Sequence, residues 1–247
     1  AGNIVETYRL LAGLDLNSKI NLAAGDYTLA IEPAGYIDAA QKFTLTFTSS
    51  ASDSGVEQEP NDTLVQTNAI AVAKTMRGRI SSDADGDYYK LSLSTTKMLD
   101  FLFKTAQSAA GRYSLDIMIG ETVINHITVP GSGASAILSA GLFPGDYYLK
   151  VTGTGVSSSN DYTIDITEVT GADREIEGNN TKVFANGLTN MKVKQARLHS
   201  EKDVDFFGVT YSDYDYFGVT IKPVTQGPNY RFQVLDGEGN ILQDVTT

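Results

Sequence analysis

The heptapeptide Glu57-Gln58-Glu59-Pro60-Asn61-Asp62-Thr63 returns 118 residues later as Glu175-Ile176-Glu177-Gly178-Asn179-Asn180-Thr181. Residues 85–89 return at the same spacing as residues 203–207. Residues 42–47 return after 119 residues as 161–166, and residues 25–29 return after 120 residues as 145–149. Four independent matches at nearly one spacing predict a tandem array with a period of about 119 residues.

This period divides the chain into three parts. Residues 54–171 make one complete module, residues 1–53 match the C-terminal part of a module, and residues 172–247 match the N-terminal part of another. Residues 2–6 also resemble residues 239–243, so the two end pieces add up to one module in which one strand-length segment is present twice.

The local pattern predicts β-structure throughout. Apolar residues alternate with polar ones at Tyr113, Leu115, Ile117 and Ile119, and again at Tyr162, Ile164 and Ile166. Gly, Asn, Asp and Ser bound these runs, and no stretch shows a helical stripe. We therefore expect an all-β chain of tandem antiparallel β-sandwich modules, jelly-roll-like, one complete and two partial.

Composition excludes several classes of protein. The chain has 30 acidic and 19 basic residues, a formal net charge of −11, which disfavours a nucleic-acid partner. It has no Cys, which excludes disulfides, zinc–thiolate sites and cysteine nucleophiles. The longest apolar runs are about five residues, as at 69–73, so we expect no membrane span.

The sequence predicts no enzyme. A nucleophilic triad needs a general base, and only His126 and His199 are present. His126 lies in an apparent strand, and His199 stands where the complete module has Ser81, so the repeat does not require it. Carboxylates that could serve a glycosidase lie at repeating loop positions, as scaffold features do.

The order of these motifs resembles a known family. It runs from 57–63 through Gly78-Arg79-Ile80 and 85–89 to 145–151 and 161–166, and it resembles the bacterial pre-peptidase C-terminal domain, which is similar to the collagen-binding domains of clostridial collagenases. The resemblance implies a small, exported, non-catalytic β-sandwich that is often appended to secreted proteases. It therefore implies an extracellular or cell-surface location in a bacterium or archaeon.

Acidic residues gather in two segments of the complete module: Glu57, Glu59 and Asp62 before its first strand, and Asp83, Asp85 and Asp87 in a later turn. If the sandwich brings the two segments together, the six carboxylates repel one another unless a cation binds. Calcium, with six to eight oxygen ligands, is the natural cation. The alternative is that these are turn-forming, solvated acids.

The family resemblance implies particular calcium ligands. In the complete module they are Glu57, Glu59, Asn61, Asp62, Asp85 and Asp87, with Asp83 as a further candidate. In the third module they are Glu175, Glu177, Asn179, Asn180, Asp203 and Asp205. Asn180 stands there in place of an acid, which lowers the charge of the second site.

The 13 tyrosines permit two interpretations. Tyrosines such as Tyr211, Tyr214 and Tyr216 could form a face for an extracellular-matrix or polysaccharide ligand. Alternatively, tyrosines in alternating strands are half-buried core residues with the hydroxyl at the rim.

The two partial modules lead to the functional hypothesis. A divided sandwich exposes an apolar face and unpaired strand edges, and each end piece lacks what the other contains. Between chains this complementarity repeats without limit. We therefore expect a secreted structural subunit that joins copies of itself head to tail into a filament by strand complementation. The alternative is a fragment of a longer surface adhesin, or of an accessory substrate-binding array of a secreted protease.

Overall fold

The computed structural model describes residues 5, 15–33, 35, 42–107, 111–156, 160–170, 173–210, 218–222 and 229–246. The chain divides into two compact units, residues 1–209 and 210–247, and each is described by itself. Most of the duplicated segment 2–6 and the tyrosines at 211, 214 and 216 lie outside the described residues.

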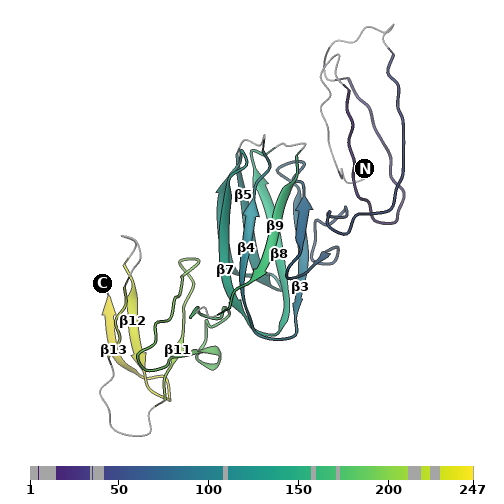
Figure 1. The fold of residues 1–247 in the computed structure, drawn as a ribbon. Helices are drawn as coiled ribbons and strands as arrows, with labels where there is room; N and C mark the ends of the chain where they lie inside the picture. Colours follow the sequence, from purple (N-terminus) through teal and green to yellow (C-terminus); the bar gives the residue numbers. More distant parts are fainter. Residues whose placement is uncertain are drawn as a thin grey trace. The chain divides into compact units, whose positions relative to one another are not determined.

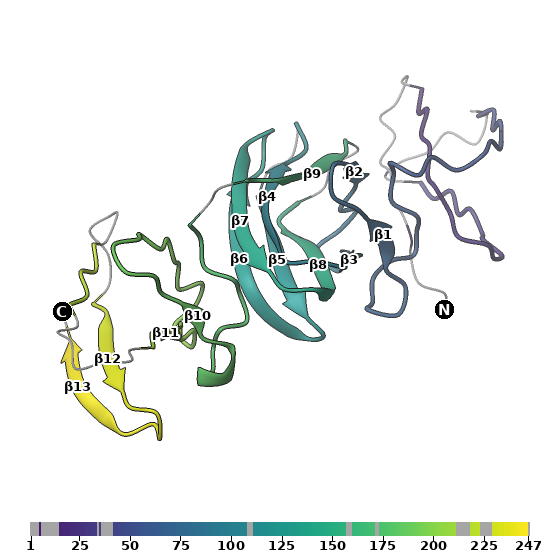
Figure 2. The same ribbon diagram turned by 60° about the horizontal axis from the view of Figure 1, so that its bottom comes forward.

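A nine-stranded β-sandwich forms the centre of the first unit (Figures 1 and 2). One sheet has the order β1 (Asn68–Ile70), β3 (Gly86–Leu93), β8 (Gly145–Thr154), β5 (Arg112–Ile119), β6 (Thr122–Pro130). The other has the order β2 (Thr75–Gly78), β9 (Tyr162–Glu168), β4 (Lys97–Lys104), β7 (Ser135–Leu142). All neighbouring strands are antiparallel except β1 and β3. The expected all-β, antiparallel sandwich is confirmed.

The core lies between the two sheets because alternate residues of each strand face inward. Leu115 and Ile117 of β5 and Ile164 of β9 are fully buried. The rings of Phe103, Tyr113 and Tyr162 pack edge to face, with centroids 5.6–6.2 Å apart. These buried tyrosines favour the core interpretation over a ligand face for the positions that the structure describes.

The part of the chain after residue 172 repeats elements of the sandwich. A short 3₁₀ helix, η1 (Lys182–Phe184), precedes β10 (Asn186–Gly187), which pairs in parallel with β11 (Phe207–Gly208) as β1 pairs with β3. Among the described residues no helix is long and apolar enough to cross a membrane.

The second unit contains the hairpin of β12 (Arg231–Leu235) and β13 (Ile241–Thr246). Its register shifts between Val234 and Leu235, as the β5–β6 register shifts between Ile117 and Met118. The two hairpins therefore share an irregularity close to the turn.

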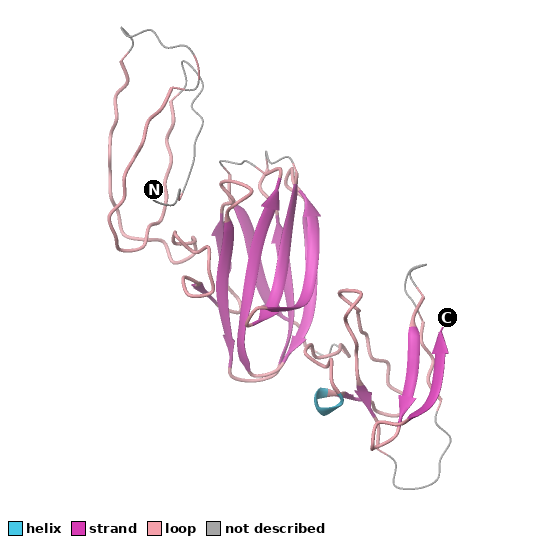
Figure 3. Cartoon of the chain, turned by 180° about the vertical axis from the view of Figure 1, so that it is seen from behind, coloured by secondary structure: helices cyan, strands magenta, loops and turns pink. Residues whose placement is uncertain are grey.

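Residues 15–33 and 42–53 form no strand, apart from one isolated bridge between Leu22 and Glu59 (Figure 3). Their apolar side chains are exposed: Leu29 is 68% exposed and Phe47 is 88% exposed. At the matching positions of the sandwich, Leu149 is 0% exposed and Ile166 is 1% exposed. In the described part of the first piece, the counterparts of these core residues of β8 and β9 are therefore exposed.

The strand pairing of the complete sandwich explains why these ladders are missing. Strands β7, β8 and β9 pair only with β2, β3, β4 and β5. Residues 15–53 correspond to β7–β9. The strands that pair with β7–β9 in the sandwich all have their counterparts in the other end piece, residues 173–246. Residues 173–246 correspond to β1–β6, and within that set only the β1–β3 and β5–β6 pairs can form; both do. Segments 193–196 and 218–222, which match parts of β2 and β4, form no strand.

Candidate metal centre in the linker

The segment before β1 places two glutamates on one side of the chain. Because side chains alternate along an extended backbone, Glu57 and Glu59 point the same way and Gln58 points oppositely. The N–H of Glu57 donates to the carbonyl of Arg77 at 2.8 Å. Asn68 holds Gln58 in place, accepting from its N–H at 2.5 Å and donating to its carbonyl at 3.0 Å. These contacts fix the direction of both glutamates.

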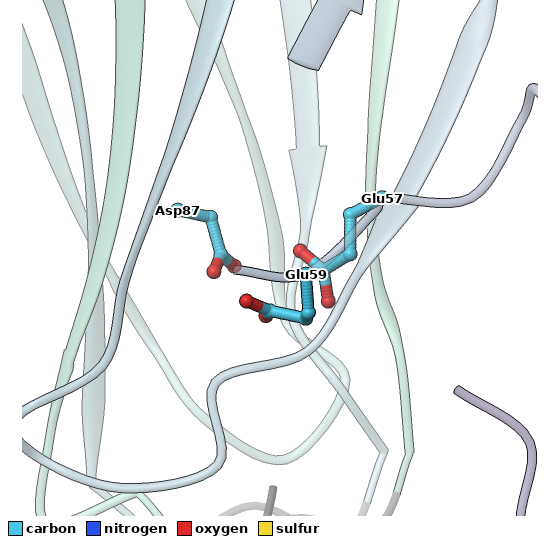
Figure 4. Close-up of side chains that lie close together, drawn as sticks. All are labelled: Glu57, Glu59 and Asp87. Atoms are coloured by element: carbon cyan, nitrogen blue, oxygen red, sulfur yellow. The ribbon is translucent and has the colours of Figure 1, made fainter. Parts of the chain in front are cut away.

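Three carboxylates converge at this point (Figure 4). One oxygen from each of Glu57, Glu59 and Asp87 lies within 4.8 Å of the others, and the three residues are 6%, 4% and 0% exposed. Asn61 is fully buried beside them, and its Nδ2 lies 3.4 Å from Glu57 Oε2. Asn61 Oδ1 and Asp87 Oδ1 are buried and have no hydrogen-bond partner. The cluster thus contains unpaired acceptor oxygens.

Two core tyrosines close the inner side of the cluster. Tyr89 Oη donates to Glu57 Oε2 at 2.9 Å, and Tyr162 Oη donates to Asp87 Oδ2 at 2.5 Å. The two hydroxyls lie 2.5 Å apart. Gly78 leaves the room for them, because a Cβ there would lie 2.3 Å from Tyr162 Oη and 2.4 Å from Tyr89 Oη. The hydrophobic core and the acidic cluster therefore share side chains.

Burial is the main electrostatic influence on these acids. It raises the pKa of Glu57 to about 7. Burial, followed by the charges of Glu57 and Asp85, raises the pKa of Glu59 to about 9. Burial and the charge of Glu57 also raise the pKa of Asp87 well above its usual value. Without a counter-charge, the cluster therefore holds protons at neutral pH.

This donor set suits a hard divalent cation. It combines several carboxylates with an amide oxygen, and calcium prefers such oxygen ligands. A bound cation would give Asn61 Oδ1 and Asp87 Oδ1 the partner that they lack. It would also offset the mutual repulsion that, after burial, contributes to raising the pKa of Glu59.

A second cluster repeats the first at the spacing of 118 residues. The N–H of Arg197 donates to Glu175 Oε1 at 2.5 Å, as the N–H of Arg79 donates to Glu57 Oε1 at 2.5 Å. Buried oxygens without a partner are Glu177 Oε2, Asn179 Oδ1 and Asp205 Oδ1. Burial and the charge of Glu175 raise the pKa of Glu177 to about 9 and that of Asp205 to about 8.

Asp85 and Asp203 border the two clusters as matched residues. Asp85 Oδ2 accepts the N–H of Ser81 at 2.5 Å, and Asp203 Oδ2 accepts the N–H of His199 at 2.8 Å. His199 Nδ1 also lies 2.5 Å from Asp203 Oδ2, so this histidine adds a side chain that the first cluster lacks.

Three other expected ligands are less buried than the three carboxylates of the first cluster. Asp83 is exposed, and its Oδ1 accepts the N–H groups of Gly155 and Val156 at 2.8 and 3.3 Å, so it caps a loop instead of joining the cluster. Asn180 is exposed, and its amide group lies beside Asp203, so that the amide nitrogen, in the orientation that satisfies both groups, donates to Asp203 Oδ1. Asp62 is half-buried, and its charge contributes to raising the pKa of Glu59.

Each linker also contacts the segment that precedes it. The N–H of Glu59 donates to the carbonyl of Asn21 at 2.8 Å, and the N–H of Glu177 donates to the carbonyl of Gly141 at 2.7 Å. Asn21 and Gly141 are 120 residues apart, so the same contact occurs twice. At the second joint Asn125 Nδ2 donates to Glu177 Oε1 at 3.1 Å. The same backbone contact therefore accompanies both acidic clusters.

Several residues of the site were not predicted. The repeat could have identified Asn68, because Asn186 lies 118 residues after it. In the structure Asn186 makes with Ile176 the same pair of hydrogen bonds that Asn68 makes with Gln58. The repeat gives no such signal for Tyr89, Tyr162 and Gly78, because different residues stand at all three matching positions. Their role follows only from the packing.

Acidity should stabilise the metal-free protein. Because the folded state raises the pKa of Glu59 from 4.5 to about 9, it binds more protons than the unfolded state between these values. Stability in a chelator therefore falls as pH rises from about 5 to 9. Calcium bound at the cluster would replace these protons, so its stabilising effect would grow over the same range. Melting curves at several pH values, with and without calcium, measure both slopes; a chelated protein that becomes more stable toward pH 9 contradicts the assignment.

No family model matches the chain, and no curated protein matches it in sequence. Among solved structures, the chain is similar to the pre-peptidase C-terminal domain of a collagenase from Bacillus anthracis, with 18% identity and a TM-score of 0.32 over 40% of this chain and 93% of that one. A family 35 carbohydrate-binding module from an environmental isolate shows 12% identity and a TM-score of 0.27, over 40% and 74% of the two chains. The GH26-CBM35 β-(1,4)-mannanase of Podospora anserina shows 19% identity and a TM-score of 0.25, over 41% of this chain and 24% of that one. At these values the comparisons carry no argument about function.

Proposed function

We propose that this protein is a non-catalytic, extracellular structural subunit that binds calcium at its module linkers and joins copies of itself head to tail. Each joint is a β-sandwich completed by residues 172–247 of one copy and residues 1–53 of the next. A bacterial or archaeal cell surface is the expected setting, where such a polymer could also bind a polysaccharide or matrix ligand.

The division of strands between the two end pieces carries this proposal. In the complete sandwich five strand pairs join the β7–β9 set to the β1–β6 set: β2–β9, β4–β9, β4–β7, β3–β8 and β5–β8. The β7–β9 set has no internal pair. Residues 15–53 therefore supply donor strands that cannot pair among themselves, and residues 173–246 supply the strands that accept them.

Exposed apolar side chains in both pieces support the same assembly. In the first piece Leu45 is 60% exposed, whereas its equivalent Ile164 is fully buried. In the last piece Ile221 is 54% exposed, whereas its equivalent Phe103 is fully buried. Burying such residues in one completed core supplies a hydrophobic driving force of about 25 cal/mol per Å² of apolar surface.

The second candidate is a segment of a longer tandem array. The same strand division favours it if the missing strands belong to the same polypeptide, before and after these residues. The protein would then be one stretch of a surface adhesin, or of an accessory array of a secreted protease, and would not polymerise by itself.

Sedimentation velocity and negative-stain electron microscopy of the 247-residue chain, with calcium and then with chelator, test the proposal. We expect uniform filaments in calcium, with an axial repeat of two sandwich modules. Monomers or disordered aggregates under both conditions would contradict it and favour the array.

A further inference from the structure

The close packing around Gly78 differs between the complete module and the two end pieces. In the complete module the hydroxyls of Tyr89 and Tyr162 fill the space where a Cβ of residue 78 would lie, at 2.4 and 2.3 Å. Glu57 Oε2 would also lie 2.5 Å from that Cβ. Contacts under 3.0 Å force a neighbouring group to shift, so the two buried tyrosine hydroxyls and Glu57 favour glycine at 78.

All three positions change in the end pieces. Ala196 takes the place of Gly78. Its neighbours Gln195 and Arg197 make hydrogen bonds with Glu175. Arg77 and Arg79, the neighbours of Gly78, make the same hydrogen bonds with Glu57. Phe207 takes the place of Tyr89, because Asn186 pairs with Phe207 as Asn68 pairs with Tyr89. Phe43 takes the place of Tyr162, at the spacing of 119 residues.

These changes compensate one another. Phe43 and Phe207 lack the two hydroxyls, and Ala196 adds a methyl group in the space that the hydroxyls would occupy. However, Phe43 belongs to the first piece, whereas Ala196 and Phe207 belong to the last. Compensation between residues in different pieces is what a shared core requires, because overpacking a core is destabilising.

We propose that Phe43 of one copy packs against Ala196 of a second copy, and that this pair selects the correct strand for the joint. The inference rests on the proposed head-to-tail assembly. It explains how the acceptor piece rejects β9 of a complete module: the Tyr162 hydroxyl would overlap the Ala196 methyl group.

The complete module rejects the donor piece for the opposite reason. Phe43 in place of Tyr162 would remove the hydroxyl that donates to Asp87 Oδ2 and contacts Tyr89 Oη. A buried carboxylate oxygen would lose its donor, which is costly in a closed core. The complete module thus favours its own β9, and the last piece favours the segment that contains Phe43.

The full chain with Phe43→Tyr tests the pair. Phe43 is 72% exposed, so this change leaves the melting temperature of the complete module unaltered. We expect the critical concentration for assembly to rise about tenfold or more. Adding Ala196→Gly should restore it to near the wild-type value, and Ala196→Gly alone should change it little.

Phe47→Tyr is the matched control, since it adds the same hydroxyl to the same donor segment away from Ala196. Whatever its own effect, Ala196→Gly should not rescue it. If the wild-type chain assembles but Phe43→Tyr is neutral, or is not rescued, the pair is refuted and the proposed assembly stands. If the wild-type chain does not assemble, both fall.

Discussion

Two variants of the 247-residue chain that are each monomeric alone should form a 1:1 dimer, and nothing larger, when they are mixed. Leu45→Asp disables the donor piece and Ile221→Asp disables the acceptor piece. Both residues are exposed in this chain, at 60% and 54%, so neither change harms the fold of the monomer. Both match fully buried positions of the complete sandwich, Ile164 and Phe103.

An unpaired carboxylate in the completed core should weaken a joint strongly. Leaving a buried charge without a partner costs about 3–5 kcal/mol, roughly a hundred- to several-thousandfold in affinity. Each variant keeps one intact piece, so the mixture forms one good joint and then stops. Sedimentation equilibrium of each variant and of the equimolar mixture measures the masses.

The alternatives predict different masses. If the two pieces of one chain closed on each other, the wild type would be monomeric instead of forming filaments. If neighbouring segments of a longer polypeptide supplied the missing strands, no mixture of these variants would associate. A dimer that forms from either variant alone would also contradict the model.

Calcium should raise the melting temperature of the complete module by about 10 °C. A free concentration of about 100 times Kd stabilises the folded state by ~2.7 kcal/mol. For a domain of this size, 1 kcal/mol corresponds to roughly 4 °C. Asp87→Asn should remove most of the response, because Asp87 is fully buried and contributes an oxygen to the cluster. Differential scanning calorimetry in calcium and in chelator measures the shift.

The chelated proteins separate a metal site from a merely structural acid. Without calcium, Asp87→Asn should melt no lower than the wild type, since it removes a buried carboxylate from a repulsive cluster and keeps an acceptor for Tyr162. Asp83→Asn is the matched control, because Asp83 caps a loop outside the cluster and asparagine can still accept there. A wild-type melting temperature unchanged by calcium would refute the site.

Some features of the molecule follow from the local sequence pattern, and others depend on tertiary packing. Alternating residues and the repeat predict the sandwich, because inward-facing positions of a strand have period two. The repeat also identifies Glu57 and Glu59, since an extended linker directs both to one side. Asp85 returns as Asp203 and Asp83 as Glu201, so an acid recurs at both positions and only the structure shows that Asp83 caps a loop. The part played by Tyr162 depends on strands far apart in sequence, and only the packed sheets reveal it.

The interleaving of the two strand sets has a kinetic consequence. In the complete sandwich β8 lies between β3 and β5, and β9 lies between β2 and β4, so donor strands occupy the middle of both sheets. The third donor strand, β7, lies at the edge of its sheet, but β8 and β9 each pair on both sides and cannot peel away alone. Separating two copies would mean unfolding a domain, and the lifetime of the polymer would follow the unfolding rate instead of an ordinary dissociation rate. Such a fibre would persist through dilution and grow only at its free ends.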